Sequence, residues 1–373
     1  MSVWNRISSL GAAIWLATAV PALAAGGNPN DAARFLAGLQ PPPTSLLTEF
    51  TRTQSWERHA KYFDAAWQKL DEQRLSKIRQ WSGKYIKDPR SPLFYMFSGP
   101  DFLYANAFFP SASIYVLSGL EPVGRIPEIN EQTVHALPNL RASIESSLSF
   151  SFFITKDMKS DLRETELSGT LPILYAYIAR SGKTIRDVSL VSLGKDGVVT
   201  PVSASAAPAG VPGAKIVFTD AGRDDQQTLY YFRVDVSDPS FKSSGFQLFS
   251  DRIGSGNSLL KSASYLTHQS GFKGVRDFLL QHSKAIVQDD SGIPLQAFNR
   301  DDWQFQPFGK YLGPIAKFDG KYYQAGLRDI FAHGAPQPLG FGIGYRWRGY
   351  DSNLLLAVRK TPRVEAVVQP PAR

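Results

Sequence analysis

The sequence predicts an α+β protein in which N-terminal amphipathic helices precede a mixed or largely antiparallel sheet packed with helices. An apolar stripe with helical period runs through residues 54–86. Later segments include both helix-like and strand-like patterns, without the regular alternation that a doubly wound sheet requires. The chain has 373 residues, which is enough to bury a large core.

The first 24 residues have the composition of a secretory signal peptide. Arg6 supplies a positive charge before an apolar run at residues 7–20, and Ala22 and Ala24 place small residues where a signal peptidase reads. Cleavage after Ala24 removes 24 of the 373 residues and leaves 349. We therefore expect a periplasmic or secreted bacterial protein with no transmembrane anchor after processing.

Composition narrows the classes of function. The chain has no cysteine, which excludes a thiol nucleophile, a zinc–thiolate site and a lipoprotein anchor. The formal net charge of +8 becomes +7 once Arg6 is removed with the signal peptide. This mild excess fits a solubilising surface or attraction to an anionic envelope component. Nucleic acid is not an expected partner, because no Lys/Arg run or RNA-binding aromatic signature is present.

The mature chain is expected to begin with a flexible arm at residues 25–52, followed by one large module at residues 53–360. The stripe at 54–86 predicts one long helix or two stacked helices. Asp101, which follows Gly-Pro, predicts the N-cap of a short helix. The other expected elements are strands at 93–97, 114–117, 188–193, 215–219 and 228–236, and helices at 101–109, 128–153 and 171–179.

Residues 203–213 are rich in Ala, Pro and Gly, and this composition fits either a boundary between two lobes or a long loop between strands. The second half predicts helices near 258–269 and 273–282, strands at 285–288 and 354–358, and a disordered tail at 361–373.

Familiar catalytic signatures are absent, including the zinc-protease, phosphate-loop and nucleophile-elbow motifs. Ser258 and Lys261 match Ser-x-x-Lys on an expected helix, where the lysine can activate the serine. The companion motifs of penicillin-recognising enzymes are missing. The spacing of the five histidines does not predict a metal site, and no cofactor is expected.

Three titratable residues are the candidates for acid/base chemistry. Asp289 and Asp290 are adjacent, and adjacent carboxylates can push their pKa values apart. His268 is the third candidate. The same Asp-Asp-Ser-Gly sequence also fits a simple turn, in which Asp side chains accept hydrogen bonds from nearby amides.

The segment at residues 340–348 combines glycine, bulky apolar residues and arginine. If it is extended, its bulky side chains share one face, while the other face carries Gly340, Gly342 and Gly344 followed by Arg346 and Arg348. Glycines on one face predict close approach by a helix, a bulge or a ligand whose anionic end meets the arginines. Packing with solvated arginines is the other interpretation.

Five strings in the chain are similar to those of an uncharacterised family of exported bacterial proteins. They are YMFSGPDFLYA at 95–105, GLEPVG at 119–124, LKSASYL at 260–266, QDDSGIP at 288–294 and FGIGYRWR at 341–348. The resemblance covers most of the mature chain. It implies export and a single family module, and it implies neither a fold nor a reaction.

The sequence as a whole favours a non-catalytic periplasmic protein that binds or organises a cell-envelope component. The alternative is a hydrolase that acts on an anionic envelope polymer. In that case Asp289 or Asp290 and His268 would supply acid and base, and Arg346 and Arg348 would orient the substrate. A pocket that gathers these residues would favour the hydrolase, and their dispersal would favour binding.

Overall fold

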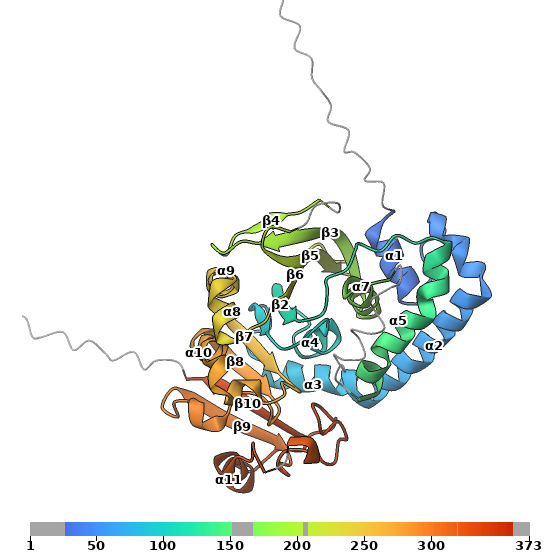
Figure 1. Ribbon diagram of the computed structural model, residues 1–373. Helices are drawn as coiled ribbons and strands as arrows, with labels where there is room; N and C mark the ends of the chain where they lie inside the picture. The colour runs from blue at the N-terminus through green and yellow to red at the C-terminus, as the bar shows by residue number, and fades with distance from the viewer. Residues whose placement is uncertain (1–26, 151–166, 204–207, 319, 361–373) are drawn as a thin grey trace, which may run out of the picture.

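The computed structural model describes residues 27–150, 167–203, 208–318 and 320–360. Within these ranges a ten-stranded mixed sheet has the order β4-β3-β5-β6-β2-β1-β7-β8-β10-β9, and helices lie on both of its faces (Figure 1). The α+β class is confirmed. The strands are β1 Leu93–Tyr95, β2 Ile114–Gly119, β3 Lys183–Leu193, β4 Val199–Pro201, β5 Val211–Asp220, β6 Gln226–Arg233, β7 Gly256–Leu260, β8 Ser283–Gln288, β9 Trp303–Gly309 and β10 Asn353–Arg359.

The centre of the sheet is parallel, which the sequence did not predict. Strands β6, β2, β1, β7 and β8 pair in parallel, whereas the flanking pairs are antiparallel. The chain leads from β1 to β2 and β6 on one side, and only then crosses to β7 and β8 on the other. In the described part of the chain between β2 and β6 lie two helices and three antiparallel strands, and this insertion hides the strand–helix alternation.

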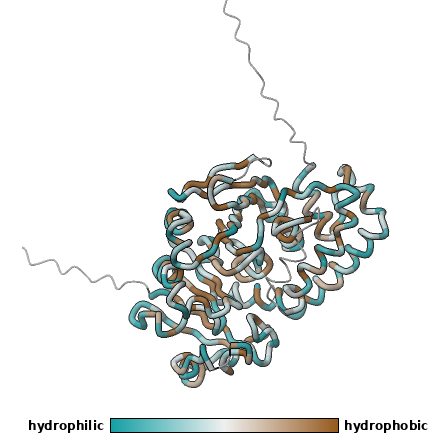
Figure 2. The backbone as a smooth tube through the Cα atoms, viewed as in Figure 1, coloured by the Kyte–Doolittle hydropathy of each residue, from teal (hydrophilic) through white to brown (hydrophobic). Residues whose placement is uncertain are grey.

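Two apolar cores cover the two faces of the sheet. Along β1, Leu93 and Tyr95 face one core and Phe94 faces the other, because successive side chains of a strand alternate. The first core is covered by α1 Pro29–Leu36, α2 Gln54–Leu70, α3 Ser76–Tyr85, α4 Phe102–Phe108, α5 Glu131–Phe150 and α7 Leu171–Arg180. The second is covered by α8 Asp238–Ser243, α9 Phe246–Ile253 and α10 Lys273–His282. Figure 2 shows largely hydrophilic outer turns on α2 and α5.

The N-terminal helices confirm one expectation and correct another. The stripe at 54–86 forms α2 and α3, joined through a π-helical turn at Asp71–Leu75. The segment expected to be a flexible arm instead contains α1, whose Phe35 and Leu36 are fully buried. The Trp56 indole N–H donates to the Phe35 carbonyl at 3.0 Å. Asn28 as the cap and Pro29 at the first turn are helix-start signals that the sequence analysis did not use.

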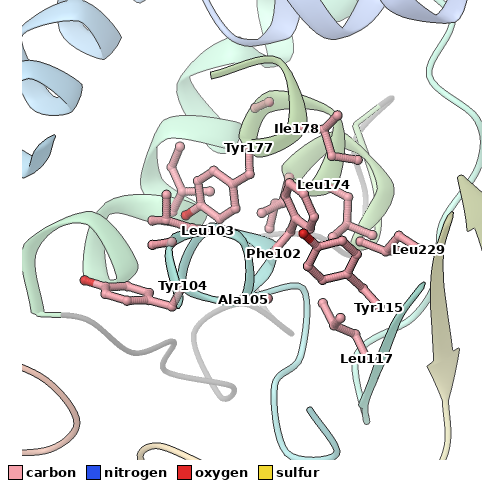
Figure 3. Close-up of a cluster of buried hydrophobic side chains, with 14 of the residues drawn as sticks. Phe102, Leu103, Tyr104, Ala105, Tyr115, Leu117, Leu174, Tyr177, Ile178 and Leu229 are labelled. Carbon is pink, nitrogen blue, oxygen red and sulfur yellow. The ribbon is translucent and has the colours of Figure 1, made fainter. Parts of the chain in front are cut away.

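Helix α4 is buried along its whole length and lies between the sheet and α7. All seven of its residues are buried. Figure 3 shows Phe102 and Leu103 among side chains of β2, β6 and α7, whereas Tyr104 leaves the helix in another direction. The Phe102 ring lies 5.1 Å from that of Tyr115. Asp101 caps this helix as predicted, since its Oδ1 accepts the Tyr104 N–H at 3.1 Å.

The remaining expectations concern segment boundaries. The stretch at 203–213 lies between β4 and β5 and includes the first residues of β5, and both strands pair with β3. Its described part therefore belongs to the sheet or leads from one strand to the next. The signal peptide at 1–24 and the tail at 361–373 lie outside the described residues.

Among the helices that are described, none combines the length and the hydropathy needed to cross a bilayer. The other helix, α11 Ala325–His333, packs beside β9.

Candidate functional site

A cleft opens where the parallel strands end. Its walls are the segments that follow β1, β2, β6 and β7, together with Phe272 and Tyr345, and its volume is about 460 Å³. The chain winds away from β1 in one direction through β2 and in the other through β7. Ligands of open α/β sheets bind at such a reversal, outside the carboxyl ends of the strands. The strand order therefore indicates a ligand-binding position here, independently of the shape of the cleft.

A buried ion pair forms part of the cleft lining. Lys261 Nζ lies 2.7 Å from Asp101 Oδ2, and each side chain is only 2% exposed. The Tyr95 hydroxyl donates to the same Oδ2 at 2.8 Å, and burial together with Asp101 holds the pKa of Tyr95 well above its usual value. Lys261 Nζ also lies 4.3 Å from the centre of the Tyr104 ring. The pair is thus fixed by α4 on one side and by the end of β7 on the other.

The Ser-x-x-Lys interpretation is wrong in its local structure. Ser258 belongs to strand β7, not to a helix, and its Oγ is 2.6 Å from Ser283 Oγ. Residues three apart on a strand point to opposite faces, so Ser258 is not presented to Lys261. The helix expected at 258–269 is replaced by the end of β7, a turn and a 3-10 helix at Leu266–His268.

The turn after β7 is held in an uncommon backbone conformation. Ser262, Ser264 and Tyr265 have φ values of 51°, 51° and 54°, a left-handed region that costs non-glycine residues roughly 1–2 kcal/mol each. The Ser262 N–H donates to Asp289 Oδ2 at 2.9 Å, and the Ala263 N–H donates to Ser291 Oγ at 2.8 Å. Strained backbone of this kind is found mostly at functional sites. Here two of the strained residues, Ser262 and Ser264, form part of the cleft wall.

Asp289 and Asp290 lie behind this wall. Asp289 is 3% and Asp290 6% exposed, and neither lines the cleft. Asp290 accepts the Tyr265 hydroxyl at 2.5 Å and the Asn353 side-chain N–H at 3.0 Å. Asp289 also accepts the backbone N–H of Ser291 at 2.9 Å. The two carboxyl groups predicted for acid/base work therefore hold loops in place, as in the turn interpretation.

Asp289 should make stability depend on pH. Burial and the neighbouring Asp290 raise its pKa to about 6. The folded pKa lies above the unfolded value of about 4, so stability from this group is present at low pH and lost as pH rises from about 4 to about 6. We expect the unfolding free energy of the wild type minus that of Asp289→Asn, measured by urea titration, to fall between pH 4 and pH 7. A difference that stays level or rises would contradict this assignment.

His268 stands apart from both aspartates. It lines a different cavity of about 620 Å³, and its ring meets that of Tyr265 edge-on at 5.2 Å. Burial lowers its pKa to about 4. No hydrogen bond joins His268 to Asp289 or Asp290 in the described parts of the chain. The structure therefore does not assemble the proposed acid/base group.

The segment at 340–348 is a set of turns rather than a strand, with one bridge between Ile343 and Arg346. The close approach expected at its glycines is made by the chain itself. A Cβ on Gly342 would lie 1.7 Å from the Trp347 carbonyl oxygen, and one on Gly344 would lie 1.8 Å from Asp289 Oδ2. Nothing lies within 4 Å of the corresponding position at Gly340.

The two arginines do not form a shared binding face. The Arg346 guanidinium donates to the carbonyl of Gly313 at 2.9 and 3.0 Å and to that of Pro314 at 3.2 Å. Arg348 is exposed, and its guanidinium lies 5.2 Å from the centre of the Trp347 ring. Arg346 thus fixes a neighbouring loop, and Arg348 alone is presented to solvent.

In the folded chain, four of the five strings from the sequence come together at the cleft, which the sequence alone did not predict. YMFSGPDFLYA, GLEPVG and LKSASYL contribute most of the cleft lining, and FGIGYRWR contributes Tyr345. QDDSGIP supports the turn after β7 from behind. The Tyr345 hydroxyl is 2.8 Å from Ser264 Oγ and donates to the Ser262 carbonyl at 3.0 Å. The available signal was small residues shortly after two strands, Ser98 and Gly99 after β1 and Ser262 and Ser264 after β7.

Comparison of the chain with protein-family models, with curated proteins and with solved structures found no match in any of the three. Among the described residues, no group of three or more histidine, aspartate and glutamate side chains is placed to hold a metal ion.

Proposed function

We propose that this is an exported binding protein whose ligand, a small molecule of the cell envelope, occupies the cleft at the ends of β1 and β7. The observation that carries the proposal is the Asp101–Lys261 ion pair in the lining of the cleft. A buried pair adds little net stability over apolar residues of the same size. A charged pair fixed in a cleft at the reversal of strand order is accordingly better explained by recognition than by stability.

The cleft is suited to a compact ligand with both polar and apolar parts. Its volume of about 460 Å³ lies within the usual range for small-molecule sites. Phe97, Leu120 and Phe272 line it along with the charged residues, and the Phe97 and Phe272 rings are 6.3 Å apart. Leu120 is 48% exposed, which leaves apolar area for a ligand to cover.

Binding is favoured over hydrolysis because the acid/base candidates are occupied elsewhere. Asp289 and Asp290 accept hydrogen bonds from the loops that they hold, and His268 lines another cavity. An anionic envelope partner would have to use Arg348 and the general positive charge, since Arg346 is held by backbone carbonyls. The cleft thus replaces the arginines as the proposed site. Export is proposed on the signal sequence alone.

Two matched leucine substitutions test the proposal. Leu120 lines the cleft and Leu248 does not, and the two are 48% and 46% exposed. The mature protein would be equilibrated with a small-molecule extract of bacterial envelopes and freed of unbound compounds, and the retained compounds identified by mass spectrometry. We expect wild type and Leu248→Ser to retain the same compound and Leu120→Ser to retain about fivefold less, because apolar contact is lost.

The proposal fails if no compound is retained by the wild type, or if Leu120→Ser retains as much as Leu248→Ser. Conversion of an extract component into new products would instead support the hydrolase.

A further inference from the structure

The cleft contains a second buried carboxylate, Glu121, which has no counter-charge among the described residues. Glu121 is 3% exposed and lines the cleft directly after β2. The Tyr231 hydroxyl donates to the Glu121 backbone carbonyl at 2.9 Å, and its contact with Glu121 Oε2 is long, at 3.4 Å. Burial and Glu121 raise the pKa of Tyr231 well above its usual value. No described residue forms a salt bridge with Glu121. A buried charge without a partner is costly, so its presence calls for a function.

Two glycines fix the position of this carboxylate. A Cβ on Gly119 would lie 2.3 Å from Glu121 Oε2 and 2.8 Å from the Gly99 Cα. A Cβ on Gly99, where φ is +54°, would lie 3.3 Å from the same oxygen. The ends of β1 and β2 therefore leave just enough room for the carboxylate between them. Glu121 is a positioned group of the cleft rather than a mobile surface side chain.

The charge balance of the lining favours a cationic ligand. Lys261 and Asp101 neutralise each other. The remaining ionisable carboxylates of the lining are Glu121 and Asp235. From the part of the chain that is described, Asp235 receives the backbone N–H and the hydroxyl of Ser237, each at 2.9 Å, and no cationic group. A ligand anion would meet like charge here, whereas a cation would restore neutrality in a partly desolvated place where Coulomb attraction is strong.

We propose that the ligand is an organic cation, a protonated primary amine whose ammonium group pairs with Glu121 and whose apolar body lies against Phe97, Leu120 and Phe272. This inference rests on the proposed function of the cleft and specifies its ligand class. An ammonium has three donors, which suits a carboxylate that receives one long hydrogen bond from the described residues. The exposed leucine and the two phenylalanine rings provide the apolar surface.

Three probes with one tail and different heads test the inference. 3-Phenylpropylamine, 3-phenylpropan-1-ol and 3-phenylpropanoate would be titrated by calorimetry into the mature wild-type protein at neutral pH. We expect the amine to bind at least about tenfold more tightly than the alcohol, and the carboxylate to bind most weakly, because of the charge-assisted pair with Glu121. Equal affinity for all three heads, or preference for the carboxylate, would overturn the inference.

Glu121→Gln and Glu128→Gln form a matched pair of variants. Both remove one acidic charge, but Glu128 is exposed and lies outside the cleft. We expect Glu121→Gln to lose the preference for the amine over the alcohol and Glu128→Gln to keep it. A preference that survives in folded Glu121→Gln contradicts the inference. If Glu121→Gln does not fold, the order of the three probes in the wild type decides.

These experiments separate this inference from the proposed function. If all three probes bind with similar affinity and Leu120→Ser weakens them all, the cleft is a binding site but the ligand is not a cation. If no probe binds and no envelope compound is retained, the proposed function fails and the inference fails with it.

Discussion

Replacing Lys261 with methionine is expected to lower the free energy of unfolding by about 3–5 kcal/mol, because Asp101 is then left as a buried charge without its counter-ion. The lysine and aspartate side chains are each 2% exposed, and the Nζ–Oδ2 distance is 2.7 Å. The Tyr95 hydroxyl and the Tyr104 N–H would remain as donors to Asp101, but neither carries a charge. Urea unfolding of the two proteins at neutral pH measures the difference.

Lys284→Met is the control for this substitution. Lys284 pairs with Asp88 at the same 2.7 Å, but the two side chains are 50% and 48% exposed. An exposed pair contributes about 0–1 kcal/mol, so this variant should unfold almost like the wild type. Combining Lys261→Met with Asp101→Asn should recover part of the loss, since neither charge remains. If Lys261→Met loses no more unfolding free energy than Lys284→Met, the buried ion pair between Asp101 and Lys261 is contradicted.

Replacing Gly344 with alanine is expected to destabilise the protein by about 2–5 kcal/mol. The residue has φ +68° and its Cβ would lie 1.8 Å from Asp289 Oδ2. The left-handed backbone costs about 1–2 kcal/mol for a non-glycine residue, and overpacking against a buried group adds about 1–3 kcal/mol. Urea unfolding compares the variant with the wild type.

Gly340→Ala is the matched control, because a Cβ at Gly340 would meet nothing within 4 Å. Its effect should stay within about 0.5 kcal/mol, as for most surface substitutions. The expectation for Gly344 is contradicted if the two alanine variants unfold at the same urea concentration.

Local signals in the sequence predicted local structure well. The Gly-Pro-Asp sequence identified Asp101 as a helix cap, and the apolar stripe at 54–86 identified the long N-terminal helical segment. Residues 273–282 coincide with α10. These features depend on neighbours within one or two helical turns, which a pattern along the chain contains.

The arrangement of the strands could not be read in the same way. The parallel centre pairs Leu93 of β1 with Asn257 of β7, which is 164 residues further along the chain, and no local pattern records that pairing. The extended interpretation of residues 340–348 failed because Gly344 takes a left-handed conformation beside Asp289. Periodicity assumes a regular backbone, and this segment lacks one.

The candidate site was predicted only in fragments. Lys261 was singled out, but with Ser258 as its partner, whereas the folded chain pairs it with Asp101, which follows the neighbouring strand β1. Glu121 lies in the string GLEPVG, but a single glutamate in Gly-Leu-Glu-Pro resembles any loop residue and gave no sign of a binding role. Only the order of the strands in the sheet places Asp101, Glu121 and Lys261 in one cleft.

A crystal structure of the mature protein grown with 3-phenylpropylamine tests the central claim most directly. The account predicts the amine nitrogen within hydrogen-bond distance of the Glu121 carboxylate, with the phenyl ring between Leu120 and Phe272 and the Asp101–Lys261 pair intact. An empty cleft at saturating amine, or amine bound only at another surface, would contradict it.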